Sequence, residues 1–91
     1  MSDVERHRVL YSGDVQGVGF RYTARELARA AGLVGYVRNL TDGRVELVLE
    51  GPPSAIRGVM ASLEAEMAGH IDETTVEPEP PTGASGFEIR F

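Results

Sequence analysis

The residues best suited to chemistry lie in the stretch 13-GDVQGVGFR-21, where three glycines precede a single arginine. Gly13, Gly17 and Gly19 permit backbone conformations with positive φ, in which successive N–H groups can turn inward around an anion. Arg21 adds a planar guanidinium whose paired donors match a phosphate group. The spacing matches neither GxxxxGK[ST] nor GxGxxG, so the stretch indicates either a different phosphate site or a tight strand–helix connection.

Asn39 is the second candidate, because it is a polar amide near the end of a mostly apolar stretch. The turn 41-TDG-43 follows almost at once, so the amide either forms an Asx turn or is directed at a ligand such as water or phosphate. Asn39-Leu40-Thr41 is also a glycosylation sequon, which we interpret as a chance match.

The remaining polar candidates are weaker. Asp14 and Asp42 could bind a metal, but two carboxylates without a supporting cluster are more typical of solvated loops, and no metal or cofactor is expected. His7 and His70 are interpreted as structural or surface residues, with His70 near a helix end.

Composition limits the alternatives. Ninety-one residues predict a single domain over 1–91, and the absence of cysteine and lysine excludes thiol and Schiff-base chemistry. The net charge of −5 argues against nucleic-acid binding. The chain has neither the run of about 18 apolar residues that would cross a membrane nor a secretory signal at its start. We therefore expect a cytoplasmic protein without membrane or nucleic-acid partners, and a monomer.

Hydrophobic periodicity defines the elements that must position Arg21 and Asn39. Period-two patterns predict strands, helical stripes begin at Phe20 and near Ile56, and Ser54 is the expected N-cap of the second helix. A short strand within 71–77 is possible, followed by a loop over 78–86. The other strands are expected at residues 6–13, 33–40, 44–51 and 87–91.

The order βαββαβ predicts an α+β ferredoxin-like fold, an antiparallel sheet with two helices packed on one face. In such a split βαβ unit the first two strands run parallel with the third between them. Their carboxyl ends, at Gly13 and Asn39, should then lie at the same end of the sheet, about 10 Å apart.

Two stretches of the sequence resemble the acylphosphatase family. Residues 13–21 fit its first signature, Gly-x-Val-Gln-Gly-Val-x-Phe-Arg, and 35-GYVRNLTDGRVELVLEG-51 is similar to its second. The closing FEIRF resembles the family's last strand, with Phe91 where Tyr is commoner. Residues 68–83 depart from the Gly-Pro-x-x-Ala-x-Val pattern common in bacterial members, which leaves substrate preference and local structure open.

The resemblance implies hydrolysis of the carboxyl–phosphate bond of small acyl phosphates, without a metal, to a carboxylate and inorganic phosphate. It implies that Arg21 binds the phosphate and that Asn39 positions the attacking water. It also implies a phosphate-binding loop that uses backbone N–H groups, those of Gln16, Gly17, Val18, Gly19 and Phe20. The substrate phosphate itself is our hypothesis for the proton acceptor.

Two rival functions follow from the same fold. One is a non-catalytic module that binds phosphate or an acyl ligand, like the acylphosphatase-like domain of larger carbamoyl-transfer maturation proteins. The other is a ferredoxin-like RNA-binding domain, which needs aromatic residues on its third strand. The stretch 44-RVELVLEG-51 has none, and the acidic charge also counts against RNA.

Overall fold

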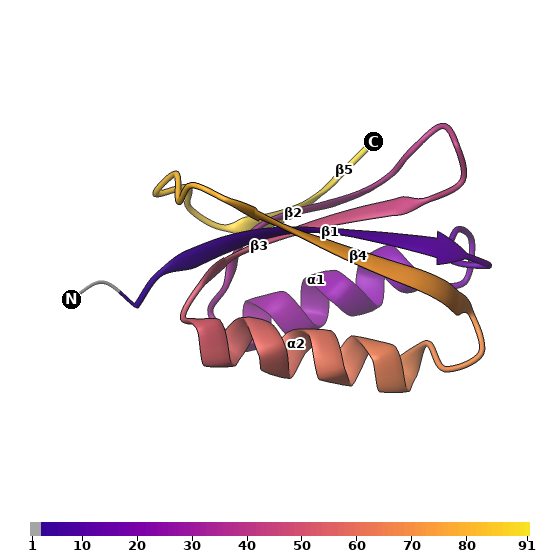
Figure 1. The fold of residues 1–91 in the computed structure, drawn as a ribbon, viewed down its shortest axis with the longest axis horizontal. Coiled ribbons are helices and arrows are strands. Elements are labelled where there is room, and N and C mark those ends of the chain that lie inside the picture. Colours follow the sequence, from indigo (N-terminus) through magenta and orange to yellow (C-terminus); the bar gives the residue numbers. More distant parts are fainter. Residues whose placement is uncertain (1–2) are drawn as a thin grey trace.

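The computed structural model describes residues 3–91, which form a sheet and two helices that both cover one of its faces (Figure 1). Each expected element is present within a few residues of its expected bounds, which confirms the predicted α+β ferredoxin-like fold. In chain order the elements are β1 (Glu5–Gly13), α1 (Phe20–Ala30), β2 (Val34–Asn39), β3 (Val45–Gly51), α2 (Pro53–Glu66), β4 (Ile71–Glu79) and β5 (Phe87–Arg90).

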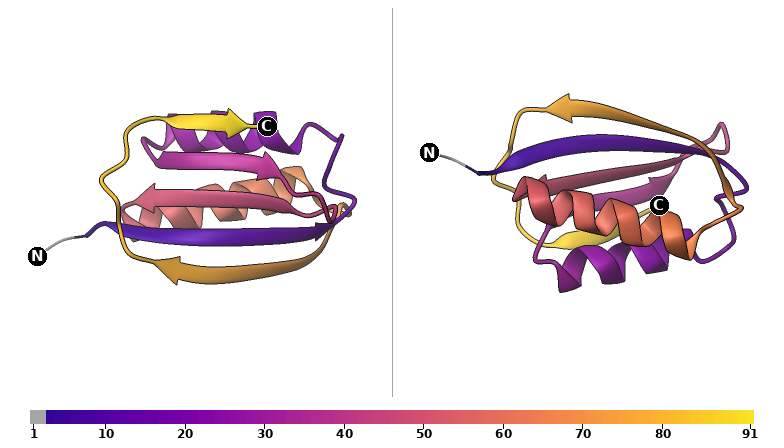
Figure 2. Two further views of the ribbon diagram at one scale, coloured as in Figure 1. Left: turned by 90° about the horizontal axis from the view of Figure 1, so that it is seen from above. Right: turned by 60° about the horizontal axis from the view of Figure 1, so that its bottom comes forward.

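The strand order β4-β1-β3-β2-β5 contains the predicted split βαβ unit. β3 pairs antiparallel with both β1 and β2 and lies between them. The arrows of β1 and β2 point the same way in Figure 2, and α1 begins at the end to which they point. Gly13 and Asn39, the last residues of these strands, therefore lie at one end of the sheet, beside the first turn of α1.

The sheet is mixed: its pairings are antiparallel, as predicted, except for that of β5 with β2. β5 runs parallel to β2, with Gly35 opposite Phe87 and Arg38 opposite Arg90. The reason lies in the chain path. β4 runs antiparallel to β1, and residues 80–86 then return the chain along the direction that β1 and β2 share.

The segment after α2 is more regular than the sequence indicated. β4 spans nine residues and pairs with β1 from Arg6↔Glu79 to Gly13↔Ile71, so residues 78–79 belong to a strand and not to a loop. Pro78 can be accommodated because β4 is an edge strand with one neighbour, β1. A residue of an edge strand needs no N–H to hydrogen-bond to a strand on its other side. The irregular stretch is shortened to residues 80–86.

The start of α2 also differs from expectation. The N-cap is Pro52 and not Ser54, which lies inside the first helical turn. The carbonyl of Pro52 accepts hydrogen bonds from the N–H groups of Ala55 (3.0 Å) and Ile56 (3.1 Å). Pro53 is favoured as the first helical residue because its fixed φ suits a helix and its missing N–H would have no helical partner.

The core fills the space between the sheet and the helices. Alternate residues of β1 and β3 point toward the helices, and the apolar stripe of each helix covers them. Fully buried members from the strands are Val9, Tyr11, Val37, Val45, Leu47 and Leu49, and those from the helices include Phe20, Ala24, Ala28, Ile56 and Leu63.

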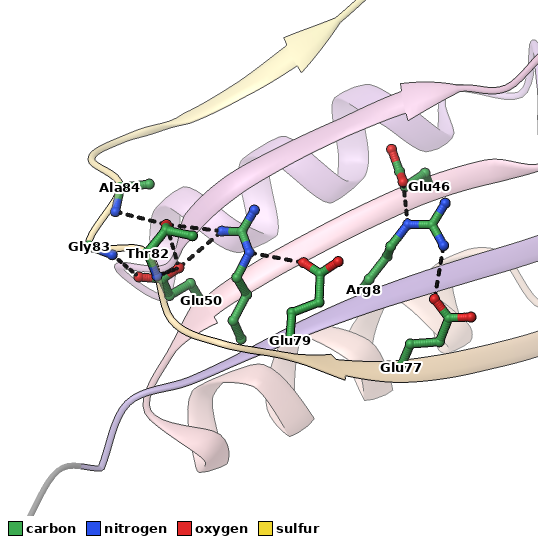
Figure 3. Close-up of polar contacts among 9 residues, drawn as sticks. Arg8, Glu46, Glu50, Glu77, Glu79, Thr82, Gly83 and Ala84 are labelled. Carbon is green, nitrogen blue, oxygen red and sulfur yellow. Dashed lines mark hydrogen bonds and ion pairs between the residues drawn. The ribbon is translucent and has the colours of Figure 1, made fainter.

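The opposite face of the sheet carries a network of ion pairs, part of which is drawn in Figure 3. Glu46 on β3 is buried, yet Arg8 and Arg38 from the two flanking strands both pair with its carboxylate. Arg8 also reaches Glu77 on β4 at 2.9 Å. Burial opposes the ionisation of Glu46, but the hydrogen bonds from both arginines hold its pKa below the usual value.

A second cluster in Figure 3 ties the loop 80–86 to the sheet. The carboxylate of Glu50 accepts hydrogen bonds from the N–H groups of Thr82 (3.0 Å) and Gly83 (2.8 Å), and from the Thr82 hydroxyl (2.9 Å). The guanidinium of Arg6 donates to the same carboxylate at 3.0 Å. These donors, the Thr82 N–H foremost, lower the pKa of Glu50 to about 2.

Candidate active site

The glycine loop connects the end of β1 to the start of α1 and presents unpaired backbone donors. Gly17 and Gly19 have φ values of 79° and 80°, in the left-handed region that favours glycine. Within the described chain, none of the N–H groups of residues 15–19 donates a hydrogen bond to a protein acceptor. A Cβ at Gly17 or Gly19 would meet nothing within 4 Å, so the space beside both residues is open to a ligand.

The first turn of α1 strengthens the attraction for an anion. Gly19 is its N-cap, no side chain caps the helix, and the turn contains no acidic residue. The first N–H groups of the helix therefore lack helical partners, and the helix dipole adds positive potential at the same place. Residues 15–19 and the start of α1 thus offer unpaired backbone donors without an acidic residue in the first helical turn.

Arg21 brings a full positive charge to this array. Six other arginines pair with carboxylates within residues 3–91, whereas no carboxylate lies within 4.0 Å of the Arg21 guanidinium. Its Cζ atom lies 5.0 Å from the ring centroid of Phe91, a cation–π contact that leaves the edge of the guanidinium available to a ligand. The charge of Arg21 is therefore uncompensated.

Asn39 faces the same space from β2. It lies opposite Val45, whose side chain is in the core, so the Asn39 side chain is on the helix-covered side of the sheet. Its Oδ1 atom is buried and accepts no hydrogen bond within the described residues. The Asx turn is formed by Asp42 instead, whose Oδ1 accepts from the N–H of Arg44 at 3.1 Å. The turn-forming alternative for Asn39 was therefore wrong.

A cavity of about 220 Å³ brings these groups together. Its walls combine backbone donors, one cation and one unpaired amide with three apolar side chains. Gly17, Gly19, Phe20, Arg21 and Asn39 are predicted site residues that line it. The complete lining is Val15, Gly17, Gly19, Phe20, Arg21, Tyr22 and Asn39.

Two residues of the predicted phosphate-binding loop lie outside the lining of the cavity. Val18 is partly buried against the core, and neither it nor Gln16 lines the cavity. The side-chain Nε2 of Gln16 donates to the carbonyl oxygens of Leu40 (2.8 Å) and Arg44 (3.0 Å). Gln16 therefore ties the glycine loop to the β2–β3 hairpin that carries Asn39. No sequence pattern predicts these partners, which are backbone atoms 24 and 28 residues away.

The beginning of the loop is fixed against β4. A Cβ on Gly13, which has a φ of 121°, would lie 2.5 Å from the carbonyl oxygen of His70, so only glycine fits there. The next N–H, of Asp14, donates to that carbonyl at 2.8 Å, and the Asp14 carboxylate lies 3.3 Å from the His70 ring. Asp14 thus faces His70 and does not line the cavity, and no three potential metal ligands cluster within residues 3–91.

Comparison with known proteins decides the family. The acylphosphatase family model matches residues 7–89. The chain belongs to the acylphosphatase family. An acylphosphatase from Synechococcus sp. is 45% identical over 91 residues, which cover 99% of this chain and 97% of the relative. The match to the family model and this relative confirm the prediction of an acylphosphatase.

Solved structures agree with this membership of the acylphosphatase family. The crystal structure of acylphosphatase from Bacillus subtilis matches with a TM-score of 0.88 and 31% identity, over 96% of this chain and 99% of that one. HypF from T. kodakarensis also matches, with a TM-score of 0.80 and 33% identity over 93% of this chain, but only 11% of the HypF chain is covered. No helix within residues 3–91 is long and apolar enough to cross a membrane.

Proposed function

We propose that this chain hydrolyses small acyl phosphates in the cavity between the glycine loop and Asn39, without a metal ion. The phosphate group binds to the backbone N–H groups of residues 16–20 and to Arg21, and Asn39 positions the attacking water. The observation that carries the proposal is the cavity itself, which joins an uncompensated guanidinium to a buried amide oxygen without a partner. An anion and a water supply what these two groups lack.

The loop and Arg21 account for binding of the phosphate. The left-handed glycines allow N–H groups to turn toward the open space, and the guanidinium can hold two phosphate oxygens at once. The same donors oppose the charge that the equatorial oxygens carry in the transition state. Binding and catalysis therefore use one set of atoms, which are held in place before the substrate arrives.

Asn39 accounts for the position of the water. Its Oδ1 accepts a hydrogen of the water, which directs the water oxygen at phosphorus. The new bond forms between that oxygen and phosphorus, while the bond from phosphorus to the carboxylate oxygen breaks. The carboxylate leaves with the bonding electron pair, and the water proton passes to a phosphate oxygen. The products are a carboxylate and inorganic phosphate.

The leaving group explains why this cavity suffices. A carboxylate is stable when it leaves, so orientation and charge stabilisation can carry the reaction. A phosphate monoester would release an alkoxide, which needs an acid to protonate it. Neither a carboxylate nor a histidine lines the cavity, so its lining lacks the commonest general acids. The chain should therefore discriminate strongly between anhydrides and esters of phosphate.

The test is hydrolysis of benzoyl phosphate beside p-nitrophenyl phosphate, each with and without EDTA. We expect turnover of benzoyl phosphate that EDTA does not change, and little turnover of the ester. Folded protein that leaves benzoyl phosphate intact would refute the enzyme proposal and favour a non-catalytic binding module. The proposal further takes the enzyme to be a cytoplasmic monomer, which fractionation and sedimentation can check.

A further inference from the structure

The cavity has an apolar part that phosphate and water do not use. Three apolar side chains line it, Val15, Phe20 and Tyr22. Val15 and Phe20 are 0% and 1% exposed, because the core already covers them. Tyr22 is 58% exposed. Only Tyr22 therefore retains apolar surface that a ligand in the cavity could cover.

The Tyr22 ring is held from one side by a neighbouring cation. The guanidinium Cζ of Arg25 lies 5.1 Å from the ring centroid, and Arg25 follows Tyr22 by three positions on the same side of α1. An ion pair between Arg25 and Glu26, at 3.4 Å, restrains that guanidinium in turn. A ring that is already restrained loses little conformational freedom when a ligand packs on it.

The reaction geometry places the acyl group on the side of Tyr22. In-line displacement requires the water and the leaving carboxylate on opposite sides of phosphorus. Asn39 on β2 holds the water, so the acyl group points away from β2. Of the side chains that line the remainder of the cavity, Tyr22 is the one that is exposed and apolar.

We propose that Tyr22 forms the subsite for the acyl group and makes the enzyme select aromatic and other large apolar acyl phosphates over acetyl phosphate. This inference rests on the proposed function. The subsite is open to solvent on one side, since Tyr22 is more than half exposed. It therefore selects by the contact that a large acyl group gains with the ring, and not by excluding small ones.

The test compares the wild type with Tyr22→Ala, Tyr22→Phe and Val76→Ala. Val76 is also an exposed apolar residue, 44% exposed, and does not line the cavity. Two ratios are measured for each protein: kcat/KM for benzoyl over acetyl phosphate, and affinity for benzoylphosphonate over acetylphosphonate, analogues that cannot be hydrolysed at an anhydride bond. Tyr22→Ala should lower both ratios about tenfold. Tyr22→Phe and Val76→Ala should keep the wild-type ratios, because the ring and not the hydroxyl makes the contact.

The outcomes separate this inference from the proposed function. If the wild type turns over both substrates and Tyr22→Ala leaves both ratios unchanged, the subsite is wrong and the proposed function stands. If the wild type turns over neither substrate, the proposed function fails, and the phosphonate ratios still decide whether Tyr22 recognises the acyl group. A fall in both ratios for Val76→Ala as well would contradict a specific role for Tyr22.

Discussion

At the scale of single residues, Arg21 and Asn39 share an unusual state. Both line the cavity, and neither side chain has a hydrogen-bond or ion-pair partner within residues 3–91. A buried amide oxygen without a partner costs free energy, and a structure keeps such a group where a ligand completes it. In the proposed function the two residues divide one task, with the cation for phosphate and the amide for water.

Arg21→Ala should reduce both turnover and phosphate binding. Loss of the guanidinium removes a charged donor from the bound phosphate, so we expect kcat/KM for benzoyl phosphate to fall about 10²–10³-fold. Inhibition by inorganic phosphate should weaken in parallel. Arg57→Ala is the matched control, because Arg57 is an exposed arginine without an ion pair in the described chain and lies outside the cavity. Equal losses in the two variants would show a general charge effect.

Asn39→Ala should separate turnover from phosphate binding. Without the amide the water is misplaced, so kcat should fall about 100-fold. The inhibition constant of inorganic phosphate should stay close to the wild-type value, because the loop and Arg21 are unchanged. Full activity in Asn39→Ala would mean that another group positions the water.

At the scale of elements, the geometry depends on how the glycine loop is held against the β2–β3 hairpin. Gln16 makes this connection with two hydrogen bonds to backbone carbonyls, while Gly13 fixes the other end of the loop against the start of β4. The loop donors and Asn39 come from different elements, and these contacts set their separation. Positioning to within about 1 Å matters for a reaction that relies on orientation.

Gln16→Ala should loosen the loop with little damage to the fold. The loss of two part-buried hydrogen bonds should lower the free energy of unfolding by about 1–2 kcal/mol. Backbone order parameters of residues 15–19 should fall, and kcat/KM should fall about tenfold, since the donors and Asn39 are no longer held together. Unchanged order parameters in α2 serve as the internal control. A variant with rigid loop and wild-type activity would contradict this role for Gln16.

At the scale of the whole molecule, the ion-pair network opposite the helices stabilises the sheet that carries the site. Glu46 joins β3 to β1 and β2, and Glu50 joins the sheet to the loop 80–86 that leads to β5. Both carboxylates have pKa values below the usual range, so the folded state favours their ionised forms. Their contribution to stability is present above the pKa of the unfolded chain and is lost as pH falls.

Glu50→Gln should show this pH dependence most clearly. Between its ordinary pKa of 4.5 and its folded value of about 2, the wild type should progressively lose the stability that ionised Glu50 provides, and the variant should lose less. At pH 7 the free energy of unfolding of the variant should be about 2 kcal/mol lower than that of the wild type. Glu88→Gln, which removes one exposed pair with Arg90, should cost under about 1 kcal/mol. Parallel pH curves for wild type and Glu50→Gln would contradict the assignment.

Periodicity and turn residues were enough to predict the order of the elements and the position of Gly13 and Asn39 at the same end of the sheet. Both features depend on local patterns and on strand direction. The full length of β4 was not predictable, since its pairing with β1 overrides the weak signal of Pro78. Neither were the side-chain partners of Gln16 or the exposure of Tyr22, which exist only after distant segments pack. The paired signatures supplied the chemistry that composition alone left open.

Attack of water at phosphorus, and not at the carbonyl carbon of the acyl group, is the step on which the proposed function depends. It is tested by a single turnover of benzoyl phosphate in water labelled with oxygen-18, followed by mass spectrometry of both products. We expect the label to enter inorganic phosphate and benzoate to remain unlabelled, because the bond between phosphorus and the carboxylate oxygen breaks. Label in benzoate would show attack at the carbonyl carbon and would contradict the proposed mechanism.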